Sequence, residues 1–461
     1  MRKVDKMMHA VILAAGMGTR MKSKHPKVIH QILGKPMVEY VITAVKKAGV
    51  EHITLVIGHK AEEVKEAVRS DVDFVLQHPQ LGTGHAVMVA QGNLPDEGEV
   101  LILTGDTPLI TPETLDKVIR YHRENRYAAT VITAMLEDPS GYGRIVRDSN
   151  GDIIKIVEHK DASPEELAIS EINASMYCFD VKKLKEVLGQ LSNDNAQGEY
   201  YLTDTIALMR EKGYRIGGYV ADSEEILGIN DRVQLYEASK VMRKRILRQH
   251  MLNGVTIIDP DSTYIGPDVK IGQDTVIYPG CVMEGDVEIG EDCYIAGSRL
   301  IDCKIGKGCS ILNSVIVSSE VKDHVNMGPF AYIRPESVIG NNVKIGDFVE
   351  IKKSIIGDGT KVPHLTYVGD AQIGSQCNLG CGTIFVNYDG RVKHKTIVGD
   401  RVFIGCNTNL IAPLLIEDDS YIAAGSTITD NVPKKALAIA RERQVIKEGW
   451  VERKFNKRED N

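Results

Sequence analysis

The sequence of 461 residues lacks three features, each of which would have indicated a particular class of protein. Its eight cysteines include no CxxC pair, which argues against zinc ligation and against a disulfide framework. No apolar run is as long as the ~18 residues of a membrane-spanning helix, so no transmembrane segment is predicted. Positive charge is not in excess, because 56 lysines and arginines face 63 aspartates and glutamates. The resulting net charge of −7 gives no general attraction to nucleic acid or to anionic lipid.

Two basic segments are local exceptions to this balance. The N-terminal stretch MRKVDKMMHAVILAAG has basic residues, but its apolar part is short, ends at glycine and is followed by no signal-peptide cleavage site. A second run has the spacing of a solvated helix face, which we favour over a nucleic-acid site. It consists of Lys240, Arg243, Lys244, Arg245 and Arg248. We therefore expect a cytoplasmic protein that binds neither nucleic acid nor membranes.

The first half of the chain alternates strand-like and helix-like segments. The strand-like segments are His9–Ala14, Ile53–Ile57, Asp73–Leu76, Val100–Leu103 and Thr130–Ala134. The helical patterns between them are Met37–Ala48, Ala61–Arg69 and Pro112–Glu124. This alternation predicts a Rossmann-like α/β fold, in which a mostly parallel sheet is covered by helices on both faces. Ligands of such folds bind beyond the carboxyl ends of the strands, where the loop Gly16–Thr19 and the segment Thr104–Asp106 fall.

The pattern changes after a helical segment from Asp231 to Leu252, for which Asp231 is the expected N-cap and Gly254 the expected stop. From Ile265 onward the period is six, as in IGPDVK, IGQDTV, IYPGCV, MEGDVE, IGEDCY and IAGSRL. This period predicts a β-solenoid with three hexads per coil and roughly nine coils up to Pro433. Because the chain is too long for one core, we divide it into residues 1–232, a helical linker at 233–253 and residues 254–461.

The hexads place aliphatic residues inside the solenoid and small residues at its corners. An aliphatic residue opens each hexad, and a small or β-branched residue stands at the fifth position, where we expect Cys281, Cys293 and Cys377 to be buried. The repeat is lost between Ile384 and Ile397, in FVNYDGRVKHKT, which predicts a loop that leaves the coil. Loops on rigid scaffolds often carry function, although an ordinary irregular loop is an alternative.

The loop Gly16–Thr19 is followed by two cations, Arg20 and Lys27. It is neither a Walker A loop, since no Gly-Lys-Ser/Thr follows, nor a dinucleotide fingerprint, since the third glycine is missing. By itself this GxG is as consistent with a bare turn. The two cations favour a phosphate site, because nucleotidyl transfer develops charge on the α-phosphate and on pyrophosphate. We expect Lys22 and Lys24 to be solvated.

The first half resembles the sugar-1-phosphate nucleotidyltransferases in several motifs. These are LAAGMGTRM with HPKVIHQILGKPM, then LGTGHAV, LTGDTPLI, GYGRIVRD, EINASMY and LGIN. The resemblance implies a nucleotide site that is formed by Leu13, Ala14, Ala15, Gly16 and Lys27, together with Gln77, Gly82, Thr83, Thr104, Gly105 and Asp106. It implies a sugar site that is formed by Gly141, Glu158 and Asn173, and Mg²⁺ ligands at Asp106 and Asn230. It also implies that Arg20 and Lys27 take part in catalysis. Without the resemblance, a capping role for Asp106 would be an equal alternative.

The repeats resemble those of left-handed parallel β-helix acyltransferases, and the predicted handedness comes from this resemblance alone. His364 is one of thirteen histidines and is weak evidence by itself. Its segment KVPHLTYVGD, together with YIRPES and FVEIKKS, resembles the catalytic segment of that family. The resemblance implies that His364 is the base that removes a proton from an amine, and we expect Glu350 to orient it.

Further ligand contacts of the repeats follow from the same resemblance. The residues implied for the aminosugar phosphate are Arg334, Lys352, Tyr367 and Asn378. Those implied for acetyl-CoA are Cys381, Asn387, Tyr388, Cys406, Ala424 and Arg441. Many family members carry serine in place of Cys406, and a thiol is a weaker hydrogen-bond donor than a hydroxyl. A direct hydrogen bond from that side chain to the substrate is therefore in doubt.

From end to end, except in the charged tail after Trp450, the chain resembles the bacterial bifunctional N-acetylglucosamine-1-phosphate uridylyltransferase/glucosamine-1-phosphate N-acetyltransferase family. The resemblance implies that the second half acetylates glucosamine-1-phosphate with acetyl-CoA. The first half would then transfer UMP from UTP to N-acetylglucosamine-1-phosphate, with Mg²⁺ as cofactor. The product is a precursor of peptidoglycan and lipopolysaccharide. The family also implies a homotrimer.

Two alternatives share this domain order. One is a nucleotidyltransferase with a single activity, whose repeats are only regulatory; it would leave His364, the Asn387–Gly390 loop and Arg441 without a role. The other is a non-enzymatic subunit of a translation exchange factor. Such subunits generally lose the catalytic motif, whereas Arg20 and Lys27 are both present here. We favour the bifunctional enzyme over both.

Overall fold

The computed structural model describes residues 8–455, and the chain divides into two compact units at Arg245 and Ile246. Residues 1–7, which begin the basic N-terminal stretch, and residues 456–461 of the charged tail lie outside the described part. Within residues 8–455, no helix is both long enough and apolar enough to cross a membrane.

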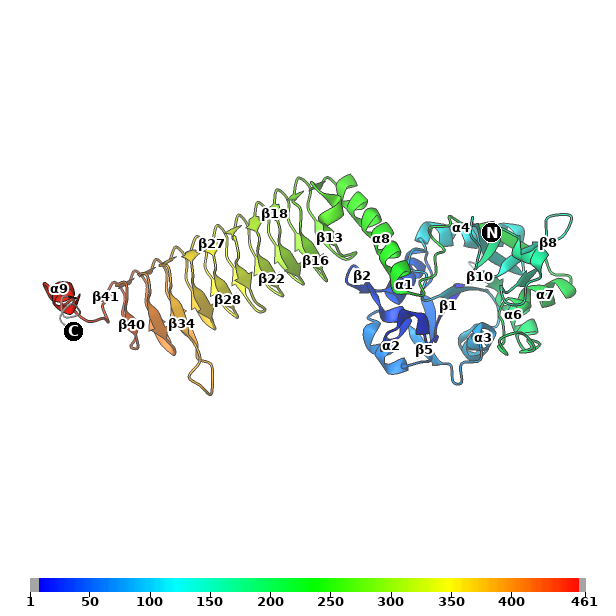
Figure 1. Ribbon diagram of the computed structural model, residues 1–461, viewed down its shortest axis with the longest axis horizontal. Coiled ribbons are helices and arrows are strands. Elements are labelled where there is room, and N and C mark those ends of the chain that lie inside the picture. Colours follow the sequence, from blue (N-terminus) through cyan, green and yellow to red (C-terminus); the bar gives the residue numbers. More distant parts are fainter. Residues whose placement is uncertain (1–7, 456–461) are drawn as a thin grey trace, which may run out of the picture. The chain divides into compact units, whose positions relative to one another are not determined.

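The first unit is built on a nine-stranded sheet (Figure 1). Its main path has the order β11-β7-β10-β6-β1-β4-β5, with β8 paired to β10 and β9 paired to β8. The bounds are β1 Met8–Ala14, β4 His52–Ile57, β5 Asp73–Leu76, β6 Glu99–Thr104, β7 Ala129–Met135, β8 Arg144–Arg147, β9 Ile153–Val157, β10 Glu171–Asp180 and β11 Ile216–Val220. A separate hairpin joins β2 Gln31–Ile32 to β3 Lys35–Pro36. All five strands that the sequence predicted are present.

Helices cover both faces of this sheet, as predicted. Along β1, the side chains of Ala10, Ile12 and Ala14 enter one core cluster and Val11 enters the other, because successive residues of a strand point to opposite faces. The first cluster includes residues of α1 and α4, and the second includes residues of α3, α6 and α7. The helices are α1 Met37–Lys47, α2 Ala61–Ala67, α3 Thr83–Ala90, α4 Pro112–Asn125, α5 Pro164–Leu167, α6 Val181–Leu188 and α7 Asp204–Glu211.

The antiparallel strand β10 is a feature that the alternating pattern did not predict. It lies between β6 and β7 and runs antiparallel to both, whereas β1 is parallel to β4 and β6. The hairpin of β8 and β9 branches from β10 through the pairing of Arg144 with Ile172. This arrangement places the turn before β8 beside Asn173 of β10, where a sugar site was expected.

Helix α8, Arg232–Leu252, follows the first sheet and leads into the repeats. The Asp231 carboxylate accepts hydrogen bonds from the backbone N–H groups of Val233 and Gln234, both at 2.9 Å, which confirms the predicted N-cap. Beyond the helix, Gly254 has φ +91°, a left-handed conformation that ends helices readily.

The second unit is a left-handed parallel β-helix, in which every pairing between named strands is parallel (Figure 1). Its three sheets contain 11, 10 and 9 strands, close to the number of coils predicted. The first sheet contains β12 Thr256–Ile257, β15 Val276–Ile277, β18 Tyr294–Ala296, β21 Ser310–Leu312, β24 Asn326–Met327, β27 Lys344–Asp347, β30 Lys361–His364, β33 Asn378–Leu379, β36 Phe403–Ile404, β39 Tyr421–Ile422 and β41 Leu437–Ala438.

The second sheet contains β13 Tyr264–Ile265, β16 Val282–Glu284, β19 Arg299–Ile301, β22 Val315–Val317, β25 Tyr332–Ile333, β28 Glu350–Lys352, β31 Tyr367–Gly369, β34 Ile384–Val386, β37 Asn409–Ile411 and β40 Thr427–Ile428. The third contains β14 Lys270–Ile271, β17 Glu288–Ile289, β20 Lys304–Ile305, β23 Glu320–Val321, β26 Val338–Ile339, β29 Ile355–Ile356, β32 Ala371–Ile373, β35 Thr396–Val398 and β38 Leu414–Ile416. A short final helix, α9, spans Trp450–Phe455.

Stacked aliphatic side chains form the core of the rod. One ladder runs through Ile277, Ile295, Ile311, Met327, Ile345, Val362, Leu379, Ile404 and Ile422, all of them buried. The corner cysteines Cys281, Cys293 and Cys377 are buried and unbridged, as predicted from their fifth position in the hexad. The Cys293 thiol donates to the carbonyl of Gly306 on the next coil at 3.1 Å, so these cysteines act as small corner residues.

The segment between β34 and β35 leaves the rod as a hairpin-like loop (Figure 1). Tyr388 and Lys393 form an antiparallel bridge, and Gly390 at the tip has φ +97°. The Asp389 carboxylate closes the turn by accepting from the N–H groups of Arg391 and Val392, both at 2.7 Å. The loop predicted from the lost hexad is therefore present.

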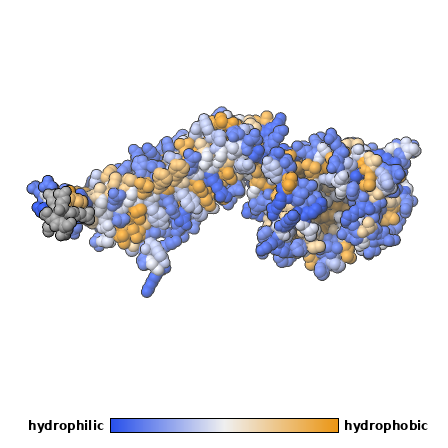
Figure 2. All heavy atoms as spheres, viewed as in Figure 1, coloured by the Kyte–Doolittle hydropathy of each residue, from blue (hydrophilic) through white to orange (hydrophobic). Residues whose placement is uncertain are grey.

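The outside of the rod is mixed in character (Figure 2). Phe330, Phe348 and Leu365 occupy successive corners and expose 57%, 58% and 56% of their surface. The rings of Phe330 and Phe348 are stacked, with centroids 5.5 Å apart. Exposed apolar side chains in one contiguous strip are typical of a surface that another molecule covers.

The inward ladder should carry much more of the stability of the rod than the outward faces. Ile351 is fully buried, whereas Ile355, four positions later, is 48% exposed. We predict that Ile351→Ala lowers the free energy of unfolding by about 2–5 kcal/mol, because it leaves a cavity between coils. The matched control Ile355→Ala should cost about 0.5 kcal/mol or less. Urea denaturation followed by far-UV circular dichroism measures both, and equal losses would contradict the assigned interior.

Candidate functional sites

The first candidate site is a cavity of about 330 Å³ at the carboxyl ends of β1 and β6. Ten of the residues implied for the nucleotide site line it: Leu13, Ala14, Ala15, Gly16, Lys27, Gln77, Gly82, Thr83, Thr104 and Asp106. The lining also includes Gln80 and Glu199, which sequence reasoning missed. The Gln80 amide donates to the carbonyl of Ala15 at 2.9 Å and so braces the glycine loop.

The segment of the implied nucleotide site around Gly82 is fixed by its neighbours. The buried Gln77 amide donates to the carbonyl of Gly82 at 2.9 Å, and the Thr83 hydroxyl accepts from the N–H of Leu202 at 3.0 Å. Gly82 has φ +104°, and a Cβ there would lie 2.7 Å from the carbonyl oxygen of Tyr200. The absence of a side chain at Gly82 therefore lets the segment of Glu199 and Tyr200 pack closely against this wall of the cavity.

Two cations and the two implied metal ligands meet at the rim of the cavity. The Lys27 ammonium contacts the Asp106 carboxylate and donates to the Asn230 side-chain oxygen at 3.0 Å. The Arg20 guanidinium donates to the same oxygen at 2.9 Å. A backbone hydrogen bond of 2.9 Å from Ile229 N–H to the Asp106 carbonyl holds the two segments together.

The donor set of Asp106 and Asn230 suits a divalent metal. Both offer hard oxygen atoms, and both already surround one positive charge, the ammonium of Lys27. Within residues 8–455, no group of three or more His, Cys, Asp or Glu side chains is placed to hold a metal ion. A metal at Asp106 and Asn230 would thus complete its coordination with water and substrate phosphates, as is usual for Mg²⁺.

The residues implied for the sugar also lie together. Asn173 N–H donates to the Gly143 carbonyl at 2.9 Å, and a Cβ on Gly143 would meet both Asn173 and the Glu158 carboxylate. Gly141, with φ +83°, starts this turn. Tyr142 lies between Gly141 and Gly143. Burial raises the pKa of Tyr142, and the negative charge of Asp106 raises it further. Tyr142 therefore lies near both the sugar turn and the metal ligands, a position that its sequence did not reveal.

Glu158 is a half-buried carboxyl that accepts a hydrogen bond from the Thr203 hydroxyl at 3.3 Å. Burial raises its pKa, and the charges of Asp204 and Asp161 add to the increase. The charged form of Glu158 is therefore partly desolvated and close to other acids, so its ionisation costs stability.

The second candidate site contains His364 at the end of β30. Its Nδ1 lies 2.6 Å from the Asp347 carboxylate on the preceding coil. The predicted partner, Glu350, instead accepts a hydrogen bond from Arg334 at 2.8 Å, so the assignment of Glu350 as the residue that orients His364 is corrected. The hydrogen bond with His364 lowers the pKa of Asp347, which remains ionised and able to hold the imidazole.

The register of the strands explains this exchange of partners. Asp347 pairs with His364 across β27 and β30, whereas Glu350 pairs with Tyr367 across β28 and β31. Gly346 permits the close approach, because a Cβ there would lie 1.7 Å from the Pro363 carbonyl oxygen. The two partners are 17 residues apart, one fewer than three complete hexads. Counting this shortened coil would have pointed to Asp347.

Successive coils continue the column of Asp347 and His364 into the residues implied for acetyl-CoA. The N–H of Gly382 donates to the His364 carbonyl at 3.4 Å, that of Asn407 to Cys381 at 2.8 Å, and that of Gly425 to Cys406 at 2.8 Å. His364, Cys381, Cys406 and Ala424 consequently occupy equivalent corners, about 4.8 Å apart per coil. A Cβ on Gly425 would lie 3.6 Å from Arg441, which places Arg441 at the far end of this column.

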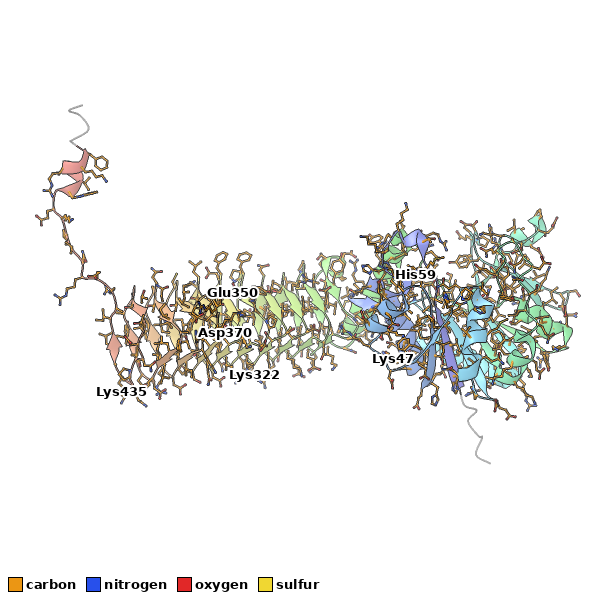
Figure 3. The ribbon with its side chains drawn as sticks, turned by 90° about the horizontal axis from the view of Figure 1, so that it is seen from below. Lys47, His59, Lys322, Glu350, Asp370 and Lys435 are labelled. Atoms are coloured by element: carbon orange, nitrogen blue, oxygen red, sulfur yellow. The ribbon has the colours of Figure 1, made fainter. Side chains whose placement is uncertain are left out.

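Positive charge gathers on the adjoining sheet. Arg334 pairs with Glu350, and Lys352 lies 3.7 Å from the Asp370 carboxylate; Figure 3 labels both acids on this part of the rod. Lys393, from the extruded loop, contacts Lys352, and its hydrogen bond with Lys352 and the positive charge of that residue lower the pKa of Lys393. Sequence reasoning missed Lys393, because an irregular loop has no register.

The remaining residues implied for this site fall on two faces. The Asn387 amide donates to the Tyr367 hydroxyl at 3.5 Å and to the Asp370 carboxylate, which joins the base of the loop to the cation cluster. Asn378 lies on the other sheet, beside Lys361 and on the face that carries His364. Tyr388 is 55% exposed on the loop. The structure thus separates Asn378 from Arg334, Lys352 and Tyr367 by one corner of the rod.

Comparison with known proteins identifies both units. A model of the MobA-like NTP transferase domain matches residues 10–190, that of the bacterial transferase hexapeptide (six repeats) matches residues 261–300, and that of the GMPPB C-terminal domain matches residues 318–386. Bifunctional protein GlmU of Thermoanaerobacter pseudethanolicus is 59% identical over 97% of this chain and 98% of its own. The GlmU protein of Acetivibrio thermocellus is 59% identical over 96% of this chain and 97% of its own. That of Clostridioides difficile is 55% identical over 97% of this chain and 98% of its own.

The chain belongs to the GlmU family. It is therefore a bifunctional enzyme, with a nucleotidyltransferase unit followed by a hexapeptide-repeat acyltransferase unit. The family implies nucleotide substrates and a divalent metal, and the donor set of Asp106 and Asn230 fits such a metal. A single-activity nucleotidyltransferase and a non-enzymatic exchange-factor subunit are set aside, because the GlmU relatives match both units.

The assignment of Asp347 as the partner of His364 predicts unequal effects of two acid-to-amide changes. Asp347→Asn removes the charge that fixes the Nδ1 tautomer, so kcat for acetyl transfer should fall by about 10²-fold or more. Glu350→Gln removes only the partner of Arg334 and should mainly raise KM for the aminosugar phosphate. Release of free thiol from acetyl-CoA measures both variants. A larger loss of kcat in Glu350→Gln would show instead that Glu350 orients His364.

The raised pKa of Glu158 predicts how the stability of the first unit depends on pH. The folded protein holds the Glu158 proton more tightly than the unfolded chain, so stability falls as pH rises from the unfolded pKa to the folded one. Glu158→Gln removes this fall, and at neutral pH the variant should be more stable than the wild type. Its KM for N-acetylglucosamine-1-phosphate should be higher, because a carboxylate acceptor is lost.

Thermal unfolding of both proteins at several pH values, with steady-state kinetics at neutral pH, checks this prediction. A variant that is less stable than the wild type at neutral pH would mean that the Glu158 carboxylate is well compensated in the folded state.

Proposed function

We propose that the rod acetylates glucosamine-1-phosphate with acetyl-CoA and that the first unit then transfers UMP from UTP to N-acetylglucosamine-1-phosphate. In this assignment residues 1–232 form the uridylyltransferase domain, residues 233–253 the helical linker and residues 254–461 the acetyltransferase domain. The observation that carries the proposal is the pairing of His364 with Asp347 at 2.6 Å, beside three cations that suit a sugar phosphate.

In the acetyltransferase reaction, His364 acts as the general base. Because Nδ1 faces the Asp347 carboxylate, Nε2 is the nitrogen that is free to take a proton from the substrate amine. Asp347 stabilises the imidazolium that results, while the amine attacks the thioester carbonyl and coenzyme A leaves as its thiol. The exposed His364 side chain keeps the base accessible to both substrates.

Recognition of the aminosugar phosphate depends on charge. Arg334, Lys352 and Lys393 contribute three positive charges, against the two carboxylates of Glu350 and Asp370. The excess positive charge favours a phosphate dianion, and the Arg334 guanidinium can bind two of its oxygens at once. Tyr367 and Asn387 would complete this wall, and Asn378 would contact the sugar from the adjoining face.

We assign acetyl-CoA to the column of corners beyond His364. Cys381, Cys406 and Ala424 offer small side chains at successive coils, which leaves room for an extended pantetheine arm. Asn387 and Tyr388 would border this groove from the loop. Arg441 would meet a phosphate group, because a guanidinium can bind two phosphate oxygens at once. The Cys406 thiol contributes a weak donor at most, so the thioester oxygen needs other donors.

In the uridylyltransferase reaction, an oxygen of the sugar phosphate attacks the α-phosphate of UTP in line, and pyrophosphate leaves. No protein base is required, because a phosphate monoester with a second pKa of about 6 is largely ionised at neutral pH. Arg20 and Lys27 neutralise the charge that develops on the phosphates, and Gly16 allows the backbone to approach them. Mg²⁺ held by Asp106 and Asn230 would supply further charge stabilisation and orient the triphosphate.

The sugar is placed by the turn that contains Gly141, together with Glu158 and Asn173. Uracil would contact the fixed backbone near Gly82 and Thr83, with Gln77 behind them. Thr104 and Gly105, at the end of β6, form the floor under the phosphates, where Gly105 N–H donates to the Leu13 carbonyl at 2.9 Å.

Assembly and location follow from the same family assignment. We propose a homotrimer in the cytoplasm, which produces UDP-N-acetylglucosamine for peptidoglycan and other cell-envelope polymers. The exposed strip of Phe330, Phe348 and Leu365 supports association, because it borders the Asp347–His364 column and is apolar. Acetyl-CoA, UTP and the two sugar phosphates are the proposed small-molecule partners.

Separate loss of the two activities tests the proposal. His364→Ala should lower acetyl transfer by about 10²-fold or more and leave uridylyl transfer intact, because the base is lost from the rod only. Arg20→Ala should lower kcat for uridylyl transfer by about 10²–10³ with acetyl transfer unchanged. Free thiol and pyrophosphate are measured separately with glucosamine-1-phosphate, acetyl-CoA, UTP and Mg²⁺.

Lys24→Met is the matched control for Arg20→Ala, since Lys24 is an exposed cation of the same segment. Loss of both activities in either single variant would indicate damage to the fold. A raised KM with unchanged kcat in Arg20→Ala would remove its role in the transition state.

A further inference from the structure

Lys27 is held where a metal ion would bind. Its ammonium contacts the Asp106 carboxylate and lies 3.0 Å from the Asn230 side-chain oxygen, the two atoms proposed as metal ligands. The Arg20 guanidinium shares the Asn230 oxygen at 2.9 Å. Two cationic side chains therefore converge on the amide oxygen, and one of them also contacts the carboxylate.

The backbone directs Lys27 to this position. Gly18, which has φ +62°, packs against the stem of Lys27, so that a Cβ on Gly18 would lie 2.5 Å from the Lys27 Cβ. Lys27 begins a short 3₁₀ helix after Pro26, whose ring restricts the chain just before it. The Lys27 and Asp106 side chains are only 14% and 19% exposed, so solvent screens their contact weakly.

A divalent metal and the Lys27 ammonium cannot both occupy this position. Mg²⁺ binds oxygen ligands at about 2.0–2.1 Å, which would bring it within a few ångströms of the ammonium. Like charges at that separation repel strongly in a partly buried site. Entry of the metal consequently requires the ammonium to leave Asp106, and the displaced ammonium then needs another anion.

We infer that Lys27 and the divalent metal are alternative occupants of the position between Asp106 and Asn230, and that the nucleotide triphosphate is the anion to which Lys27 moves. The inference rests on the proposed metal site. It makes metal binding and triphosphate binding mutually dependent. The triphosphate draws the ammonium away from Asp106 and so frees the metal position, and the metal displaces the ammonium toward the triphosphate. The metal should bind poorly to the protein alone and well together with UTP.

Manganese binding to the full-length protein without nucleotide tests the inference. Free Mn²⁺ is measured by electron paramagnetic resonance for the wild type, Lys27→Met and the control Lys24→Met. Lys27→Met should bind Mn²⁺ at least tenfold more tightly than the wild type, because its competitor is gone while the stem volume is kept. Lys24→Met should equal the wild type. Far-UV circular dichroism and the thermal unfolding of each variant report that the first unit, which contains all the substituted positions, is folded.

The double variant Lys27→Met with Asp106→Asn should lose the gained affinity, which ties the gain to the carboxylate. Equal or weaker Mn²⁺ binding by Lys27→Met would overturn the inference, even if Asp106→Asn weakens Mn²⁺ binding in the presence of UTP. If Asp106→Asn leaves Mn²⁺ binding unchanged with and without UTP, the metal site itself is wrong, and the inference falls with it.

Discussion

Parallel pairing of strands in fixed register is the constraint on which both sites depend. In a parallel ladder, a residue contacts the residue that the register places beside it and that residue's near neighbours, whatever their chemical suitability. In the rod this rule pairs Asp347 with His364 and leaves Glu350 beside Tyr367, although a carboxylate at either position could orient an imidazole. In the first unit it brings the ends of β1 and β6 to one edge, so that Leu13 and Thr104 line the same cavity.

The two sites solve one electrostatic problem in different ways. Each must bind phosphate groups while the protein as a whole is negatively charged. In the first unit, Lys27 is partly enclosed with a carboxylate and an amide, so its charge is poorly screened and can be redirected, and the exposed Arg20 lies beside it. On the rod, Lys352 and Lys393 are brought into contact by an extruded loop, and their mutual repulsion favours the binding of an anion beside them. Carboxylates balance both clusters incompletely, which leaves positive charge available for substrates.

Sequence patterns predicted most of the fold because each pattern had a simple physical cause. The alternation of apolar strands with amphipathic helices gave the first sheet, and the period of six gave the solenoid and its buried cysteines. The antiparallel β10 was not predictable in this way, because strand direction depends on how the chain returns and not on hydrophobic period. Asp106 and Asn230 were paired only through the family resemblance. They are far apart in the sequence, and the backbone hydrogen bond from Ile229 to Asp106 that brings them together leaves no local sequence signal. The partner of His364 was assigned wrongly because one coil is shorter than three hexads, and Lys393 was missed because its loop has no period.

The central claim is that one chain carries two chemically independent sites, one at the edge of a sheet and the other along the corner of a solenoid. Crystals grown with Mn²⁺, a non-reactive UTP analogue and coenzyme A test it most directly. The account predicts an anomalous manganese signal between Asp106 and Asn230, the triphosphate against Arg20 and Lys27, and the sulfur of coenzyme A beside His364. Density that places the triphosphate away from Asp106, or the sulfur away from the column of Cys381 and Cys406, would contradict it.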